Sequence, residues 1–296
     1  MARTRFRSDK GLTLRMGGVG LGLGALYVAF GALLITQTGF AFGLIITVGM
    51  AWGQWFFSDS LALRSMSAKV VAPEQAPELH AMIDRLCALA DMPKPRVAVA
   101  VTDMPNAFAT GRTPKHSAVC VTTGIMQRLD ADELEGVLAH ELSHVANRDV
   151  SVMTVASSLG LLAGFITRWG MYFGGGRSRG KGGAPFIVVF LASMAVYFIS
   201  FLLTRALSRY RELSADRSGA YLTGRPSKLA SALVKISGEM ARIPNKDLRE
   251  GQAISAFFFA PAINREAVGA LMSTHPPLQQ RLDQLAAVGA ELSEKG

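Results

Sequence analysis

The chain has 296 residues, of which 50% are hydrophobic and 18% are charged, and its mean hydropathy is +0.28. Soluble proteins carry about a quarter charged residues, so this composition indicates a membrane protein and argues against a wholly soluble one. The net charge of +9 belongs largely to basic residues that flank apolar runs, which argues against a nucleic-acid-binding face. Cys87 and Cys120 stand in no C-x-x-C pair and are interpreted as reduced thiols of a cytoplasmic domain.

Two apolar runs near the N-terminus predict a transmembrane hairpin, 16–57. Residues 1–15 before it are basic and are expected to be cytoplasmic. The uncharged run of about 16–36 is long enough to cross a bilayer as a helix and too long for a signal peptide. The second run, about 40–57, has Trp52 near its end, where amphipathic rings favour the headgroup region.

The stretch 58–149 is polar enough to form the first half of a soluble domain. Apolar residues at helical spacing after Pro77 predict a helix that ends near Pro93. Two β-branched runs, 96–102 and 117–123, predict strands of a small sheet that is antiparallel or mixed.

The pattern H-E-x-x-H lies on the next predicted helix. Asp130 and Glu133 form the sequence pattern of a capping box, which indicates where this helix begins. His140 and His144 are four residues apart, so on a helix they project from one face and can share one metal ion. Glu141 lies about 100° around the axis, close enough to reach a water on that metal. Zinc held by two imidazoles and a carboxylate keeps its fourth position for that water and lowers the water's pKa.

Two further apolar runs, about 150–173 and about 185–204, predict a second transmembrane hairpin, 150–204. If these runs do not fully cross the bilayer, the side on which the H-E-x-x-H motif lies is unchanged. No helix breaker follows the last run, so we expect one continuous helix to leave the membrane and to begin the second soluble half, 205–296.

Glu212 on this emerging helix is the predicted third metal ligand. Asp216, four residues later on the same face, is spaced to accept a hydrogen bond from a ligating imidazole and so to orient it. Alone, these two carboxylates would indicate a solvated helix face paired with arginines. The upstream H-E-x-x-H favours their interpretation as parts of a metal site.

The distribution of basic residues predicts which side of the membrane carries the soluble halves. With four crossings, both halves lie on the side of the N-terminus. Basic residues that flank the membrane on that side are Arg3, Arg5, Arg7, Lys10, Arg15, Arg64, Lys69, Arg205, Arg209 and Arg211. The opposite side has only Arg168, Arg177, Arg179 and Lys181. The positive-inside rule therefore predicts a cytoplasmic active site.

Over essentially its whole length, the chain resembles the HtpX-type membrane zinc metalloproteases, which are related to the CAAX prenyl proteases. A lone H-E-x-x-H is a moderate signal, whereas four motifs in the family's order are a strong one. The motifs are Asn106-Ala-Phe-Ala-Thr-Gly111, His140-Glu-Leu-Ser-His144-Val-Ala-Asn-Arg-Asp149, Arg211-Glu-Leu-Ser-Ala-Asp216 and Thr274-His-Pro-Pro277. The resemblance implies a mainly α integral membrane protein with four transmembrane helices. It also implies a cytoplasmic α+β zincin-like (gluzincin) metalloprotease domain with a small β-sheet.

The resemblance also implies the roles of the site residues. One Zn²⁺ per chain is bound by His140, His144 and Glu212. Glu141 is the general base, which takes a proton from the zinc-bound water that attacks the peptide carbonyl and passes it to the leaving amine. Candidates that stabilise the oxyanion or support the ligands are Asp216, His275, Arg209 and Asp149. For His275, a locally satisfied histidine at a helix start is an equal alternative.

The segment from Asn106 to Gly111 resembles the family's edge strand. There an extended substrate would bind by β-augmentation, and the alternative is an ordinary sheet edge. The residues concerned are Asn106, Ala107, Phe108, Ala109, Thr110 and Gly111.

The implied function is that of a zinc metalloendopeptidase in protein quality control at the bacterial inner membrane. Its partners would be the lipid bilayer and protein or peptide substrates, chiefly misfolded or damaged membrane proteins, with no nucleic acid. An intramembrane protease is disfavoured because acidic residues precede His140, and CAAX prenyl proteases proper have longer chains with more spans. A catalytically weak or inactive zinc-binding scaffold or regulator is disfavoured because Glu141 serves no structural purpose in a closed zinc site.

Overall fold

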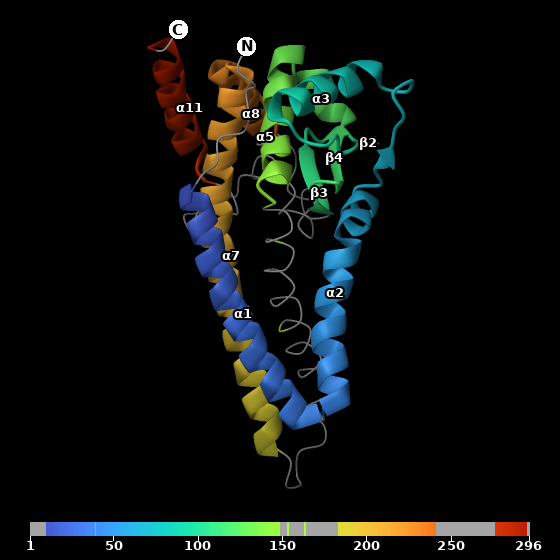
Figure 1. Ribbon diagram of the computed structural model, residues 1–296, viewed down its shortest axis with the longest axis vertical. Helices are drawn as coiled ribbons and strands as arrows, with labels where there is room; N and C mark the ends of the chain where they lie inside the picture. Colours follow the sequence, from blue (N-terminus) through green and yellow to red (C-terminus); the bar gives the residue numbers. More distant parts are fainter. Residues whose placement is uncertain are drawn as a thin grey trace. The chain divides into compact units, whose positions relative to one another are not determined.

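The structure, a computed structural model, describes residues 10–38, 40–148, 153, 163, 183–240 and 276–294 (Figure 1). The chain forms two compact units. One unit contains Thr13–Phe57 and Ser151–Leu207, and the other contains Met1–Leu12, Ser58–Val150 and Ser208–Gly296.

Long apolar helices make up the described part of the first unit. Helix α1 covers Lys10–Thr38, α2 covers Phe40–Ser65 and α7 covers Gly183–Thr223. The parts of α2 after Phe57 and of α7 after Leu207 belong to the second unit. By length and composition, two helices in the described part of the chain could cross a membrane, one over Lys10–Leu33 and one over Ile187–Thr223. The third predicted run, 150–173, lies outside the described residues except for positions 153 and 163.

Some large apolar side chains of α1 and α7 are buried together, and others lie exposed. Leu23 and Phe30 of α1 are buried in one cluster with Val196 of α7. Leu21 is 79% exposed and Phe198 is 60% exposed, although water would not favour either side chain at the surface. The expectation of one continuous helix after the fourth run is confirmed, because α7 continues without interruption to Thr223.

A four-stranded sheet lies in the second unit. Its strands are β1 (Lys69–Val70), β2 (Arg96–Ala100), β3 (Ala107–Thr113) and β4 (His116–Thr122), in the order β1-β2-β4-β3. The β2–β4 pair is parallel and the other two pairs are antiparallel, so the sheet is mixed. Strand β3 therefore lies at an edge of the sheet. The two-residue strand β1 was not predicted, because a strand this short has no alternating pattern to recognise.

Helix α5 (Ala131–Ala146) is the centre of the second unit's core. It packs against α3 (Pro77–Ala90), against α8 (Pro226–Met240) and against β3. Fully buried residues of this core are Ile83, Leu86, Ile125, Val137, Leu138, Leu142, Leu229 and Leu233. The remaining described helices of the unit are α4 (Thr123–Arg128) and α11 (Leu278–Ser293).

Both cysteines are free and buried. Burial raises the pKa of Cys87 to about 11 and that of Cys120 to about 12. Both thiols therefore remain protonated near neutral pH and are poor nucleophiles.

The predicted capping box at the start of α5 is confirmed. Asp130 Oδ1 accepts a hydrogen bond from Glu133 N at 2.8 Å, and Glu133 Oε2 accepts one from Asp130 N at 2.9 Å. The Glu133 carboxylate also accepts hydrogen bonds of 2.7 Å each from Ser231 Oγ and Lys235 Nζ of α8. These bonds fix both the first residue of α5 and its pairing with α8.

We predict that Asp130→Ala lowers the free energy of unfolding by about 1 kcal/mol, because one backbone N–H at the helix start loses its acceptor. Thermal unfolding of the full chain in detergent, followed by circular dichroism, measures this effect. Asp84→Ala is the matched control, because Asp84 contributes only an exposed ion pair with Lys94 and its loss should change little. Equal shifts in the two variants would contradict the capping role.

Candidate metal centre

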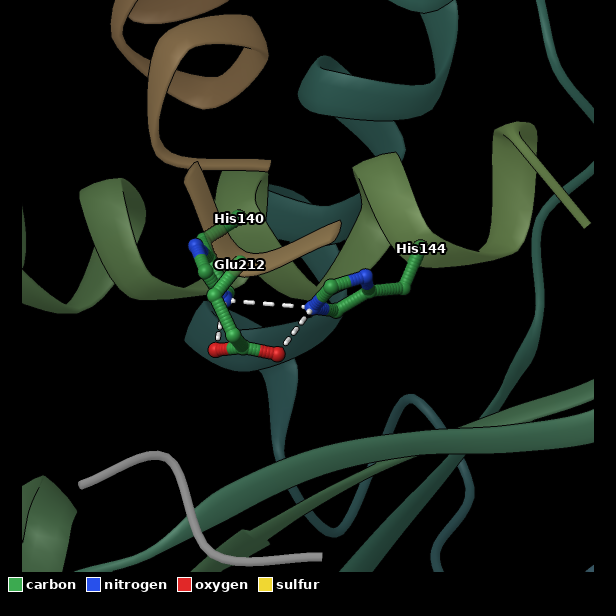
Figure 2. A group of neighbouring side chains, drawn as sticks. All are labelled: His140, His144 and Glu212. Carbon is green, nitrogen blue, oxygen red and sulfur yellow. Dashed lines mark hydrogen bonds and ion pairs between the residues drawn. The ribbon is translucent and has the colours of Figure 1, made fainter. Parts of the chain in front are cut away.

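Two helices bring the three predicted ligands together. His140 and His144 lie one turn apart on α5, and Glu212 lies on α7. Figure 2 shows the three side chains pointing toward one another. His140 Nε2 is 3.2 Å from His144 Nε2 and 3.6 Å from Glu212 Oε2, and His144 Nε2 is 3.4 Å from Glu212 Oε1. All three residues are buried.

These distances fit a zinc ion. Ligands at about 2.0–2.1 Å from Zn²⁺ in tetrahedral geometry are separated from one another by about 3.3 Å. The donors of His140, His144 and Glu212 lie within a few tenths of an ångström of that separation. Among the residues that the structure describes, they form the one group of three or more His, Cys, Asp or Glu that could hold a metal ion.

A glycine on α7 allows the two helices to approach. Glu212, Asp216 and Gly219 follow one another at helical spacing on one face of α7. A Cβ atom at Gly219 would lie 2.9 Å from His140 N, closer than real Cβ contacts. Glycine at this position therefore lets Glu212 and Asp216 reach His140.

Asp216 occupies the supporting position that its spacing predicts. Its Oδ1 lies 2.9 Å from His140 Nδ1, and its side chain is fully buried. Donation of the Nδ1 proton to this carboxylate places the free lone pair of the imidazole on Nε2, where the other ligands converge.

The predicted general base contacts the predicted substrate strand. Glu141 Oε2 accepts a hydrogen bond of 2.9 Å from the backbone N–H of Ala109 on β3. Burial, the largest effect, raises the pKa of the Glu141 carboxyl above its usual value, while both histidines oppose the shift. A carboxylate with a raised pKa accepts a proton more readily, as a general base must.

The backbone of β3 alternates between its two edges. Asn106 O accepts a hydrogen bond from Thr122 N of β4 at 3.0 Å, so the even-numbered residues face β4. Ala107 and Ala109 consequently direct their N–H and C=O groups away from β4, which is why Ala109 N–H reaches Glu141. Their small side chains pack in the core cluster that contains α5.

Two arginines that were not predicted lie next to the ligands. Arg281 of α11 is 2% exposed and holds both oxygens of Asp216, with Nε–Oδ2 and Nη2–Oδ1 distances of 2.7 Å each. Arg211 Nη2 lies 3.5 Å from His144 Nδ1. A metal-binding His144 carries its proton on Nδ1 and a guanidinium only donates, so the Arg211 contact is not a hydrogen bond in the metal-bound state.

A signal for Arg281 was present in the sequence. Arg281, Leu285 and Val288 form the buried face of α11, so a charged residue occupies a position of the apolar stripe. A charge at such a position indicates a buried partner.

The other predicted site residues are placed as follows. Asn106 is buried and joins the start of β3 to β4, since its N–H donates to Thr122 Oγ1 at 2.9 Å. Arg209 lies half-buried on α7 before Glu212, and its role at the oxyanion stays a prediction. His275 and Asp149 lie outside the described residues.

Comparisons with known proteins show which family the chain resembles. The profile of the family described as "Peptidase family M48" matches residues 73–288. A Streptomyces coelicolor protein named "Protease HtpX homolog 1" is 55% identical over 99% of this chain and 97% of its own length. A Moorella thermoacetica "Protease HtpX homolog" is 52% identical over 99% of each chain. The crystal structure of S. mikatae Ste24p superposes with a TM-score of 0.52 at 17% sequence identity. The match covers 94% of this chain and 66% of the Ste24p chain, and it shows that the two share a fold.

We predict that Gly219→Ala weakens metal binding, because the added methyl group would push α7 away from His140 N. Zinc per chain, measured by atomic absorption after gel filtration in detergent, should fall well below that of the unmodified protein. Gly238→Ala is the matched control, since nothing lies within 4 Å of a Cβ atom at that position of α8. Full zinc content in Gly219→Ala would show that the close approach is dispensable.

Proposed function

Because the chain belongs to peptidase family M48 and is a metalloprotease, we propose that it is a zinc-dependent endopeptidase of the bacterial inner membrane that hydrolyses misfolded or damaged membrane proteins. The observation that carries the proposal is the convergence of His140, His144 and Glu212 beside Glu141. One Zn²⁺ per chain would be held by the first three residues.

Zinc, when bound, supplies Lewis acidity that lowers the pKa of a bound water and polarises the peptide carbonyl. Glu141 accepts a proton from the attacking water and delivers it to the leaving amine. Ala109 N–H holds Glu141 Oε2, so proton transfer uses the carboxylate in a fixed orientation. Asp216 keeps the proton of His140 on Nδ1 and the metal-binding lone pair on Nε2.

We propose that the substrate binds as an additional strand on the free edge of β3. The outward-directed backbone of Ala107 and the C=O of Ala109 would offer hydrogen bonds to an extended peptide, while the N–H of Ala109 is already donated to Glu141. A peptide paired with this edge would pass next to the general base. Such binding uses main-chain groups and therefore requires an extended substrate more than a particular sequence.

The membrane arrangement in this proposal has four spans of about 16–36, 40–57, 150–173 and 185–204, with a zincin-like domain formed by 58–149 and 205–296. Exposed apolar side chains on α1 and α7 support the first and last of these spans. The excess of basic flanking residues on the N-terminal side supports an active site that faces the cytoplasm.

We predict that Glu141→Gln reduces cleavage of an unfolded protein by about 10²–10⁴-fold, because the amide cannot accept a proton. Cleavage by purified, zinc-loaded protein in detergent is followed on gels, and zinc content is measured on the same sample. Glu74→Gln is the matched control on an exposed loop and should retain full activity. Equal cleavage by both variants, or none by the unmodified protein, would favour a zinc-binding scaffold without turnover.

We predict that Glu212→Gln loses most of the bound zinc, because the neutral amide is a poor ligand in place of a carboxylate. Zinc per chain after dialysis against a weak chelator measures this loss, again with Glu74→Gln beside it. Zinc content equal to that of the unmodified protein would mean that another residue is the third ligand.

A further inference from the structure

Arg281 occupies a position that stability alone does not explain. It is 2% exposed and lies on α11 in the same stripe as Leu285 and Val288. Burial of a guanidinium costs several kcal/mol, and an apolar side chain of similar volume is often equally or more stabilising there. The arginine therefore calls for a reason beyond packing.

The geometry at Asp216 supplies this reason. Arg281 Nε and Nη2 each donate to a different oxygen of Asp216 at 2.7 Å, so the carboxylate plane is held at two points. The oxygen that receives Nη2 is Oδ1, which is also the oxygen 2.9 Å from His140 Nδ1. Rotation of the carboxylate away from His140 would break both bonds to Arg281.

We propose that Arg281 is a positioning residue of the metal centre, and that through Asp216 it links the docking of α11 to metal binding at His140. The proposal rests on the zinc site proposed above. Three helices take part in series, since α11 carries Arg281, α7 carries Asp216 and α5 carries His140. The Arg281 charge also acts on Glu212 and Glu141, but its two hydrogen bonds to Asp216 are what would orient the imidazole of His140.

Such a link acts in both directions. If loss of the Arg281 contact weakens zinc binding by some factor, removal of zinc weakens the contact of α11 by the same factor. The rest of α11 is held independently, by Leu285 and Val288 in the core and by a hydrogen bond from Tyr221 O–H to Glu291. The loss of protection from hydrogen exchange on zinc removal should therefore be concentrated in the first turns of α11, around Arg281.

The zinc dissociation constant of the full-length protein in detergent, measured by competition with a chromophoric chelator, tests the first half of the proposal. Arg281→Met should raise it about 10- to 100-fold, the usual cost of losing a group that orients a ligand. Arg281→Lys, which keeps a buried cation but cannot hold both oxygens, should rescue part of this loss. Arg217→Met is the matched control, since Arg217 is exposed on α7 beside Asp216, and should leave the constant unchanged.

A double-mutant cycle separates positioning from general stabilisation. In an Asp216→Asn background, Arg281→Met should cause no further loss of zinc affinity, because the orienting route through Asp216 is already removed. The visible spectrum of the Co²⁺-loaded protein should change in Arg281→Met as the His140 ligand reorients, and stay unchanged in Arg217→Met. Additive losses of affinity in the cycle, or an unchanged spectrum in Arg281→Met, would overturn the positioning role.

Hydrogen exchange tests the reverse direction. Removal of zinc by a chelator should accelerate exchange in the first turns of α11 in the unmodified protein and leave Arg281→Met unaffected. Zinc-independent exchange in the unmodified protein would overturn the link. If the unmodified protein bound no zinc, this inference and the proposed function would both fail, whereas unchanged affinity in Arg281→Met would overturn the inference alone.

Discussion

The close approach of α5 and α7 is the constraint on which the metal centre depends. A zinc site tolerates errors of only about 0.2 Å in ligand position, yet the three proposed ligands here lie far apart in the sequence. Gly219 provides the room, because a methyl group there would lie 2.9 Å from His140 N. A second glycine, Gly136, plays a similar part on the α8 side, where a Cβ atom would lie 3.3 Å from Leu229. The position of α5, held by its capping box and by α8, therefore sets the geometry of every group that acts on the metal.

The site gathers an unusual number of ionisable side chains in a buried place. Glu141, Glu212 and Asp216 are each at most 5% exposed, as are both histidines. Burial disfavours their charged forms, so each must be compensated by a partner or by the metal. Arg281 compensates Asp216, the N–H of Ala109 compensates one oxygen of Glu141, and the cluster of three ligands would be compensated by Zn²⁺. Since a fold selected for stability alone would fill such a volume with apolar residues, the arrangement is best understood as a catalytic one.

Local patterns in the sequence predicted the parts of this site that depend on local geometry. The spacing of His140 and His144 and the capping box at Asp130 follow from the helical repeat, and both are found as expected. The strand order β1-β2-β4-β3 was not predictable in the same way, because pairing of distant strands leaves no local pattern. Arg281 was missed for a related reason, since its partner on α7 lies 65 residues earlier and only its place in an apolar stripe indicates burial. The long apolar helices α1 and α7 were recognisable by hydropathy alone, because a continuous apolar run is a local property of the sequence.

The contact between Ala109 and Glu141 also bears on how the proposed protease would select its substrates. Along β3, alternate residues direct their backbone groups away from β4, and among them the N–H of Ala109 is donated to Glu141 while the proposal assigns the backbone of the buried Ala107 to a peptide. A peptide that paired with Ala107, as proposed, would be placed in register with Glu141 through backbone groups that every sequence possesses. Recognition of this kind discriminates between extended and folded chains and very little between side chains. An enzyme that removes damaged proteins needs that selectivity, since what its substrates share is the loss of folded structure and not a common cleavage sequence.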